Sequence, residues 1–524
     1  MTINNIFNIN NKSPNRLEFK ASGSTVNAFI TTHNSSHAIF KFDDKVTLDN
    51  TVNYTRTGST PYNFALLYKH PTEIKTFTLN NAHIYNSLDL SRFENLETIT
   101  LMQHPSLTSV TFPNISNYST TVTMTYTGIL QADISNINKL KNNVTFQSNN
   151  NLTSVTFPNS SESINSINFA HCDLRELNIS TLTNVYNSIV ANNNPNLTAI
   201  TMPVTYSPLN FLILSNCNLK TLDLSSLHDL KGYINISQNS SLSAVTMPNN
   251  TGSTTYVYLN SCDLKSLDLS PMSGLGGYFE ASSNYNLSAI TFGNHSNEFT
   301  HFSLTYCNLK NLNISGLTNL GGSVLLNNNS SLSAITFPIS NKRINSLTLN
   351  NCDLRNVNIQ NLSQLGGTLT FGNNFNLTAV TFPNNSQNIS NVNVYNCNLI
   401  NLDLRSLSGL SGSIWTRSNT GLTSIYLPSN NSAFTYMDLS YCNYSYINFY
   451  PISEGNSNNI YINTSYNYMN TGDANHIAYD LDTIGWTGGT LTTKTVDGSS
   501  GGYNGTAATQ SLTSKGWTIN ETVN

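Results

Sequence analysis

The chain has 524 residues, of which 38% are hydrophobic and only 10% are charged, and its formal net charge is −4. This length exceeds a single ordinary core, so we expect several domains or a repeat array. The low charge and the lack of a basic cluster argue against a nucleic-acid partner, because binding to the phosphate backbone requires clustered Lys and Arg. No run of about 18 apolar residues occurs, so we expect no membrane insertion.

Residues 1–75 follow no period and contain strand-like runs at Ala38–Phe42 and Phe64–Tyr68. We expect a small β-rich segment that either caps a following array or attaches the chain to a larger assembly. The first residues, Met1–Phe7, have neither the basic nor the apolar region of a secretory signal. We therefore expect a protein that stays inside its cell or leaves without such a signal, as in the release of assembled virus particles by lysis.

Residues 76–450 repeat every 45 residues. A leucine series starts at Leu107, and a glycine series runs from Gly232 to Gly412. All seven cysteines form one series, Cys172, Cys217, Cys262, Cys307, Cys352, Cys397 and Cys442. An asparagine series runs Asn149, Asn194, Asn239, Asn284, Asn329, Asn374 and Asn419. Such self-similarity predicts a solenoid in which stacked coils share one core.

Each 45-residue unit consists of two coils of about 22 and 23 residues. The first contains Ile344–Leu354, which matches the leucine-rich-repeat signature L-x-x-L-x-L-x-x-C-x-L. The second contains Leu369–Asn374, where Asn replaces Cys. We expect Leu347 and Leu349 to point inward from a strand and the asparagines to bond backbone groups as a ladder.

The cysteine column predicts free, buried thiols. Equivalent cysteines lie two coils apart, roughly 10 Å at the usual strand spacing, whereas a disulfide needs Cα atoms within about 7 Å. The repeated glycines predict a bend that a side chain would obstruct.

The segment Leu152–Pro158, with the sequence LTSVTFP, and its variants at 197–203 and 377–383 resemble half of a BspA-like leucine-rich repeat. That family occurs in bacterial surface proteins, in some protists and in bacteriophage tail and fibre proteins. The ending Ala507–Ile519 looks like a short element found on similar bacterial and phage surface proteins. The resemblance implies a β-rich leucine-rich-repeat solenoid and, with the missing signal, a phage virion protein.

Residues 451–524 contain two predicted helices. Ala474, Ile477, Ala478 and Leu481 share a helix face, with Asp473 placed as the cap and Gly485 beyond the end. A second helix is predicted over 506–515, and its sequence is related to the first at a distance of 31 residues. We expect this C-terminal tail to cap the last coil.

No catalytic or metal-binding motif is recognisable, so we expect a protein without enzymatic activity, cofactor or bound metal. An Asp/Asn series could suggest a calcium ladder, but half its members are Asn, and solvent-facing polar positions explain it better. That series is Asp133, Asn178, Asp223, Asp268, Asn313, Asn358, Asp403 and Asn448.

The strands of the array, which we expect to line a concave face, expose aromatic residues at positions where most repeats carry Ser, Thr or Asn. We predict that these residues bind a ligand, because aromatic rings stack on sugars and are also enriched in protein interfaces. The alternative is that aromatic residues simply favour strands. The candidates are Phe211, Tyr233, Tyr256, Tyr258, Tyr278, His301, Tyr395, Trp415, Arg417 and Tyr436.

These observations predict a phage tail-fibre or receptor-binding component that recognises a glycan or protein on the host surface. The partners would then be that receptor and other virion proteins or further copies of the chain. One alternative is an adhesin on the bacterial surface or in the extracellular space. The other is a purely structural virion or filament subunit, whose aromatic residues contact neighbouring copies.

Overall fold

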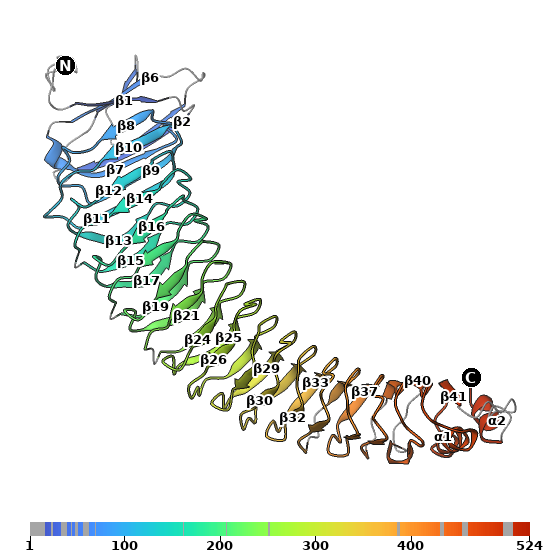
Figure 1. Cartoon of the computed structure of the whole chain (residues 1–524). Helices are drawn as coiled ribbons and strands as arrows, with labels where there is room; N and C mark the ends of the chain where they lie inside the picture. The colour runs from blue at the N-terminus through green and yellow to red at the C-terminus, as the bar shows by residue number, and fades with distance from the viewer. Residues whose placement is uncertain are drawn as a thin grey trace. The chain divides into compact units, whose positions relative to one another are not determined.

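The computed structural model describes residues 16–21, 25–32, 39–42, 45–47, 51–55, 62–68, 70–160, 162–205, 207–249, 252–384, 388–429, 434–452, 459–495 and 507–523. The chain divides into two compact units, Met1–Cys262 and Asp263–Asn524. Both units are leucine-rich-repeat solenoids whose strands are joined by turns and loops, with almost no helix (Figure 1).

The first unit begins with antiparallel strands. One four-stranded sheet has the order β1 (Arg16–Ala21), β6 (Tyr62–Leu67), β3 (Ile39–Phe42) and β4 (Lys45–Thr47). The predicted strand runs thus correspond to β3 and β6, although Ala38 lies outside the described residues. A further strand, β2 (Thr25–Thr32), pairs antiparallel with β5 (Thr51–Thr55) and with β7 (Ile74–Asn80), which follows a 3-10 turn at Pro71–Glu73. Strand β2 therefore covers the edge of the parallel sheet that starts with β7.

Each coil of the first unit contributes one strand to a long parallel sheet. These strands are β7, β9 (Thr98–His104), β11 (Thr120–Thr127), β13 (Leu140–Thr145), β15 (Ile164–Asn168), β17 (Val185–Val190), β19 (Leu209–Ile213), β21 (Leu230–Asn235) and β23 (Thr254–Tyr258). Shorter strands pair in twos within the coils: β8 (Asn86–Asp89) with β10 (Leu107–Thr111), β12 (Gln131–Asp133) with β14 (Ser154–Thr156), β16 (Glu176–Asn178) with β18 (Ala199–Thr201), and β20 (Thr221–Asp223) with β22 (Ala244–Thr246).

The second unit repeats this plan. Its long parallel sheet contains β25 (Leu275–Glu280), β27 (Phe299–Ser303), β29 (Leu320–Leu325), β31 (Ile344–Thr348), β33 (Leu365–Thr370), β35 (Ile389–Asn393), β37 (Leu410–Trp415), β39 (Phe434–Asp438), β40 (Ile460–Asn463), β41 (Gly489–Thr495) and β42 (Trp517–Val523). The short pairs are β24 (Ser266–Asp268) with β26 (Ala289–Thr291), β28 (Asn311–Asn313) with β30 (Ala334–Thr336), β32 (Asn356–Asn358) with β34 (Ala379–Thr381), and β36 (Asn401–Asp403) with β38 (Ser424–Tyr426).

The core lies between the two rows of strands. In β31 and the residues after it, Leu347 and Leu349 are fully buried, whereas Ser346 and Thr348 are partly exposed. The prediction from alternation is therefore confirmed. A single coil could not bury these leucines alone, so the stacking of neighbours supplies the apolar contacts that hold the array together.

Buried asparagine and cysteine columns join successive coils. Asn374 is fully buried and donates from Nδ2 to the carbonyls of Leu349 and Phe371 at 2.8 and 2.7 Å, while its Oδ1 accepts from the amide of Leu354 at 3.3 Å. In the alternate coils a thiol takes this place, and Cys352 donates to the carbonyl of Leu326 at 3.5 Å. The predicted ladder and the predicted free, buried thiols are both confirmed.

Two further repeated positions shape the turns. Gly322 has φ +62°, and a Cβ there would lie 1.8 Å from the carbonyl oxygen of Thr300, which confirms that the bend excludes a side chain. The exposed Asp/Asn series accepts the amide of the residue two positions later, as Asp223 does from Ser225 at 2.9 Å and Asn313 from Ser315 at 3.1 Å. Asp and Asn alternate here because both provide the Oδ1 acceptor that such a turn requires.

The C-terminal tail extends the parallel sheet of the second unit through β40, β41 and β42 (Figure 1). The 3-10 turn Tyr450–Ile452 precedes β40. The predicted helices are α1 (Thr471–Thr483) and α2 (Ala507–Ser514), and they contact each other. The cap of α1 is Asn470 rather than Asp473, which is the third residue of the helix and completes a capping box with Asn470.

Candidate functional site

The outward side of the long sheets carries the predicted aromatic residues. Strand β19 has buried Leu209 and Leu212, while Phe211 is 45% exposed and Ile213 is partly exposed. Parallel pairing in register aligns the outward residues of successive strands in columns. The structure places the ten predicted residues in three groups along these columns.

The first group lies in the first unit. Phe211 is in register with Tyr233, and Tyr233 is in register with Tyr256. The ring of Tyr233 lies 6.2 Å from that of Tyr256 and 5.5 Å from that of Tyr258. Asn235 donates to the hydroxyl of Tyr233 at 3.2 Å. These four aromatic residues lie on neighbouring strands, with Phe211 and Tyr256 exposed and Tyr233 and Tyr258 partly exposed.

The second group, in the second unit, is a stacked pair. The rings of Tyr278 and His301 lie 4.1 Å apart with an interplanar angle of 9°. Burial raises the pKa of the neighbouring Glu280 and lowers the pKa of His301. Both shifts have the same cause, because partial burial disfavours the charged form of each group.

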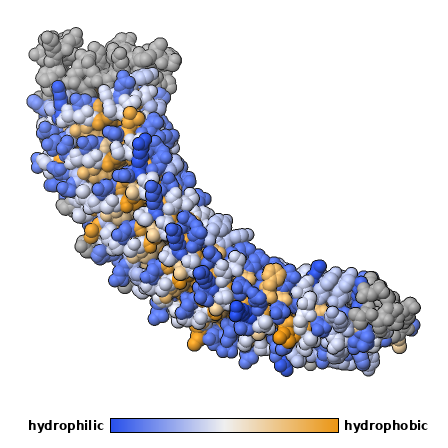
Figure 2. All heavy atoms as spheres, in the orientation of Figure 1, coloured by the Kyte–Doolittle hydropathy of each residue, from blue (hydrophilic) through white to orange (hydrophobic). Residues whose placement is uncertain are grey.

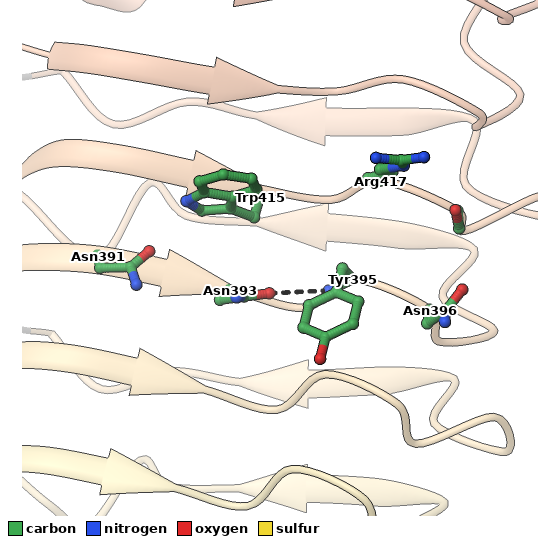
Figure 3. Close-up of a pocket in the computed structure, with 7 residues that line it drawn as sticks. Asn391, Asn393, Tyr395, Asn396, Trp415 and Arg417 are labelled. Carbon is green, nitrogen blue, oxygen red and sulfur yellow. Dashed lines mark hydrogen bonds between the residues drawn. The ribbon is translucent and has the colours of Figure 1, made fainter.

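The third group surrounds a hollow of about 530 Å³, the Trp415 pocket, lined by Asn391, Asn393, Tyr395, Asn396, Trp415, Arg417 and Ser418. Figure 3 shows Asn391, Asn393 and Tyr395 along one coil and Trp415 and Arg417 along the next. The ring of Tyr436 stacks on Trp415 at 4.4 Å, and Tyr461 stacks on Tyr436 at 5.1 Å. Tyr436 thus packs against the indole without lining the pocket, while Trp415 itself borders the hollow.

Tyr395 lies flat beside the pocket because Gly372 leaves room for it. A Cβ on Gly372 would lie 2.4 Å from Cε1 of Tyr395. The hydroxyl of Tyr395 accepts a hydrogen bond from Asn373 at 2.9 Å. The phenol ring is thus held in place on the glycine backbone.

The polar groups of the Trp415 pocket are mainly donors. Asn393 Oδ1 accepts the amide of Tyr395 at 3.1 Å (dashed in Figure 3), and Asn391 Oδ1 accepts from Ser413 at 3.1 Å. Both side-chain oxygens are therefore occupied, and the exposed guanidinium of Arg417 adds a further donor to the lining. The lining residues include no carboxylate, and the nearby Asp438 is 3% exposed and accepts from Ser440 and Asn463.

A row of rings and cations continues from this pocket along the second unit. The guanidinium of Arg417 lies 5.3 Å from the ring centre of Tyr441. Tyr441 stacks on Tyr466 at 4.2 Å, and the ammonium of Lys494 lies 4.4 Å from the ring centre of Tyr466. Both tyrosines have positive φ, 54° and 59°, a conformation that bulky residues rarely adopt. We call this row the Arg417–Lys494 ladder.

The sequence prediction missed several of these residues. Tyr461 and Tyr466 lie beyond the strict period, because the last asparagine of the buried column is Asn467 instead of a residue 45 positions after Asn419. No sequence signal distinguishes Asn391, Asn393 and Asn396, because Ser, Thr and Asn are the common residues at the outward positions of the repeats. A comparison of each position across the repeats would have found Gly372 as an exception, whereas Lys494 lies in the tail beyond the repeats.

The described residues contain no cluster of three or more His, Cys, Asp or Glu side chains that could hold a metal ion. Within the same residues, no helix has the length and apolar character needed to span a membrane. The buried cysteines are not nucleophiles near neutral pH, because burial raises their pKa, to about 11 for Cys352 and about 12 for Cys397.

The fold and its repeated strands define a leucine-rich-repeat scaffold, a class typical of surface and binding proteins. The chain belongs to the BspA-type leucine-rich-repeat family, whose model matches in six copies over residues 72–196, 187–278, 277–369 and 367–467. The predicted resemblance is thereby confirmed. No curated protein matches the chain. A solved leucine-rich repeat protein from Bacteroides ovatus is similar, with 14% identity, 76% of this chain and 89% of that chain covered, and a TM-score of 0.34.

Proposed function

We propose that the protein is an attachment protein that recognises a carbohydrate on a cell surface through the outward side of its strands, centred on the Trp415 pocket. This proposal rests on one observation. Several side chains that depart from the repeat converge on one hollow, whereas a purely structural array has no reason to place its exceptions together.

The departures are clear from equivalent positions. The residue equivalent to Arg417 in the preceding repeats is Gly372, Asn327, Ser282, Ser237, Asn192 or Gln147. The residue equivalent to Tyr395 is Asn350, Thr305, Asn260, Ser215 or Ala170. Small polar residues therefore suffice for the fold at both positions. The large residues at 395, 415 and 417 and the glycine that accommodates Tyr395 instead build a pocket.

The chemistry of the pocket suits a sugar ring. The partly exposed indole of Trp415 borders the hollow and offers a surface for stacking against C–H groups, and the amides of Asn391 and Asn393, whose oxygens are occupied, line the same hollow. Ligand sites generally combine an apolar surface with a few oriented polar groups in this way. On the face of the molecule drawn in Figure 2, hydrophobic residues lie among hydrophilic ones.

The setting we propose is a phage tail fibre or another receptor-binding virion component. The resemblance of the C-terminal segment to an element of bacterial and phage surface proteins supports it. An adhesin on the bacterial surface would use the same pocket. Residues 1–75 and 451–524 would cap the array of residues 76–450, with the N-terminal segment also attaching it to other virion proteins.

Binding of purified protein to whole cells of candidate hosts tests the proposal. Trp415→Ala should weaken cell binding by about 30-fold, since a central tryptophan contributes about 2 kcal/mol to an interface. Phe375→Ala is the matched control, because Phe375 is 70% exposed and lies outside the pocket. Unchanged binding of the Trp415 variant would refute the site. Filament formation by the wild-type chain without cell binding would instead favour the structural alternative.

A further inference from the structure

The Trp415 pocket has a charge pattern that narrows its ligand. We infer that it selects an acidic sugar unit, whose carboxylate pairs with Arg417 while its ring stacks on Trp415. This inference rests on the proposed function, because it takes the ligand to be a carbohydrate and adds which kind.

The donor inventory carries the first step. Internal hydrogen bonds occupy the side-chain oxygens of Asn391 and Asn393, and that of Asn393 is fixed because its partner is the backbone amide of Tyr395. Asn396 is the exception among the lining amides, because its Nδ2 donates to Asn373 at 3.0 Å and its oxygen remains as an acceptor. With the NH2 groups of Asn391 and Asn393 and the guanidinium of Arg417, the lining amides and cation still supply more donors than acceptors. A neutral sugar offers hydroxyls that donate and accept equally, whereas an acidic sugar adds two strong acceptor oxygens. An acceptor-rich ligand matches this pocket better.

The position of Arg417 carries the second step. Its guanidinium is exposed, lines the pocket and lies over the ring of Tyr441 instead of pairing with a carboxylate among the described residues. By contrast, the guanidinium of Arg405 is neutralised by Asp403 at 2.6 Å. The guanidinium of Arg417 thus has no carboxylate partner among the described residues, and its planar geometry suits bidentate pairing to the carboxylate of a ligand.

The Arg417–Lys494 ladder carries the third step. It leads away from the pocket over Tyr441 and Tyr466 to a second cation, three strand spacings or roughly 14 Å from Arg417. Two cations joined by exposed rings favour a chain with repeated acidic groups over a single acidic sugar. We therefore expect oligomers of a uronic acid to bind more tightly than the monomer.

The intrinsic fluorescence of the protein reports on this pocket. Of the three tryptophans, Trp486 and Trp517 are 2% and 3% exposed, whereas Trp415 borders the hollow. Quenching by acrylamide therefore measures the accessibility of Trp415 above a protected background. A ligand that stacks on the indole should reduce this quenching, and titration of the effect yields an affinity.

The test compares a galacturonate tetrasaccharide with its fully methyl-esterified form, and 3′-sialyllactose with lactose. We expect the acidic member of at least one pair to protect Trp415 at 10- to 100-fold lower concentration, the range expected for a charge-assisted hydrogen bond. Arg417→Gln should remove this difference, while Arg405→Gln should preserve it. Lys494→Gln should weaken binding of the tetrasaccharide and leave binding of the galacturonate monomer unchanged.

The outcomes separate this inference from the proposed function. Equal protection of Trp415 from acrylamide by the acidic and the neutral glycan of each pair would overturn the acidic preference. Carbohydrate binding at the pocket would then still stand. Protection by none of the four glycans at millimolar concentration would also overturn the inference, and whole-cell binding would then decide the proposed function alone. Circular dichroism of each variant shows whether the solenoid is intact.

Discussion

Replacing Asn374 with alanine should destabilise the second unit by about 4 kcal/mol. The asparagine is fully buried, and its loss leaves the carbonyl of Leu349 and the amide of Leu354 without their side-chain partner. The carbonyl of Phe371 loses the stronger of its two side-chain donors and keeps the thiol of Cys397 at 3.3 Å. Each unsatisfied buried group costs about 1–3 kcal/mol, with the weaker bond to Leu354 at the low end. The created cavity adds a smaller cost.

The cysteine coils provide a graded comparison. Asn374→Cys introduces the group that the alternate coils use, and a thiol there can donate to one carbonyl, as Cys352 does to Leu326. We expect this variant to lose about half as much stability as Asn374→Ala. Asn376→Ala is the control, because Asn376 is exposed and bonds only the side chain of Asp353 among the described residues, so its loss should cost under about 0.5 kcal/mol.

Hydrogen exchange is the suitable assay, with urea unfolding as the second measurement. Repeat arrays unfold in parts, so a single midpoint does not describe them. Exchange should accelerate in the coils around residues 349–374 and stay unchanged in the first unit. Equal effects of Asn374→Ala and Asn376→Ala would refute the ladder as a source of stability. Equal effects of the alanine and cysteine variants would refute the equivalence of thiol and amide.

Three further predictions concern buried groups and turns. The seven thiols should resist maleimide in the native protein at pH 7.5 and should all react in denaturant, because burial raises the pKa of each to about 11 or 12. Labelling of the native chain would contradict their burial. His104 occupies the asparagine column, donates to Leu79 at 2.8 Å and has a pKa lowered by burial from 6.5 to about 4. Because folding favours the neutral form, the stability of the first unit should fall as the pH drops from about 6.5 to 4. His104→Asn should reduce this loss, measured by urea unfolding at several pH values. An unchanged dependence of stability on pH in the variant would contradict the prediction. Gly322→Ala should cost several kcal/mol because of its clash with the carbonyl of Thr300, whereas Gly485→Ala, also at positive φ but with nothing within 4 Å, should cost about 1–2 kcal/mol; similar losses in thermal unfolding would contradict the clash.

The repeat fold could be predicted from the sequence because its determinants are local and periodic. The spacing of Leu347 and Leu349 dictates which strand face is buried, and the fixed period of Asn374 and Cys352 dictates that equivalent groups stack. Every coil meets the same requirement, so one coil predicts the others. The two tail helices were likewise predictable from their apolar spacing and flanking residues.

The candidate residues on the strands could also be predicted, because alternation determines which side chains point outward. Their grouping could not. Trp415, Tyr436 and Tyr461 form one stack, but the register of β40 depends on extra residues in the preceding coil that break the period. The position of Asn467 in the buried column depends on the same change.

Only the tertiary structure decided what the Trp415 pocket offers a ligand. The sequence places an amide at Asn393 but does not show that the backbone of Tyr395 takes its oxygen. Nor does it show that Gly372 makes room for Tyr395, or that Arg417 lies on Tyr441. These contacts join residues more than 20 positions apart or fix side-chain directions, and such details depend on how adjacent coils pack rather than on the pattern within one coil.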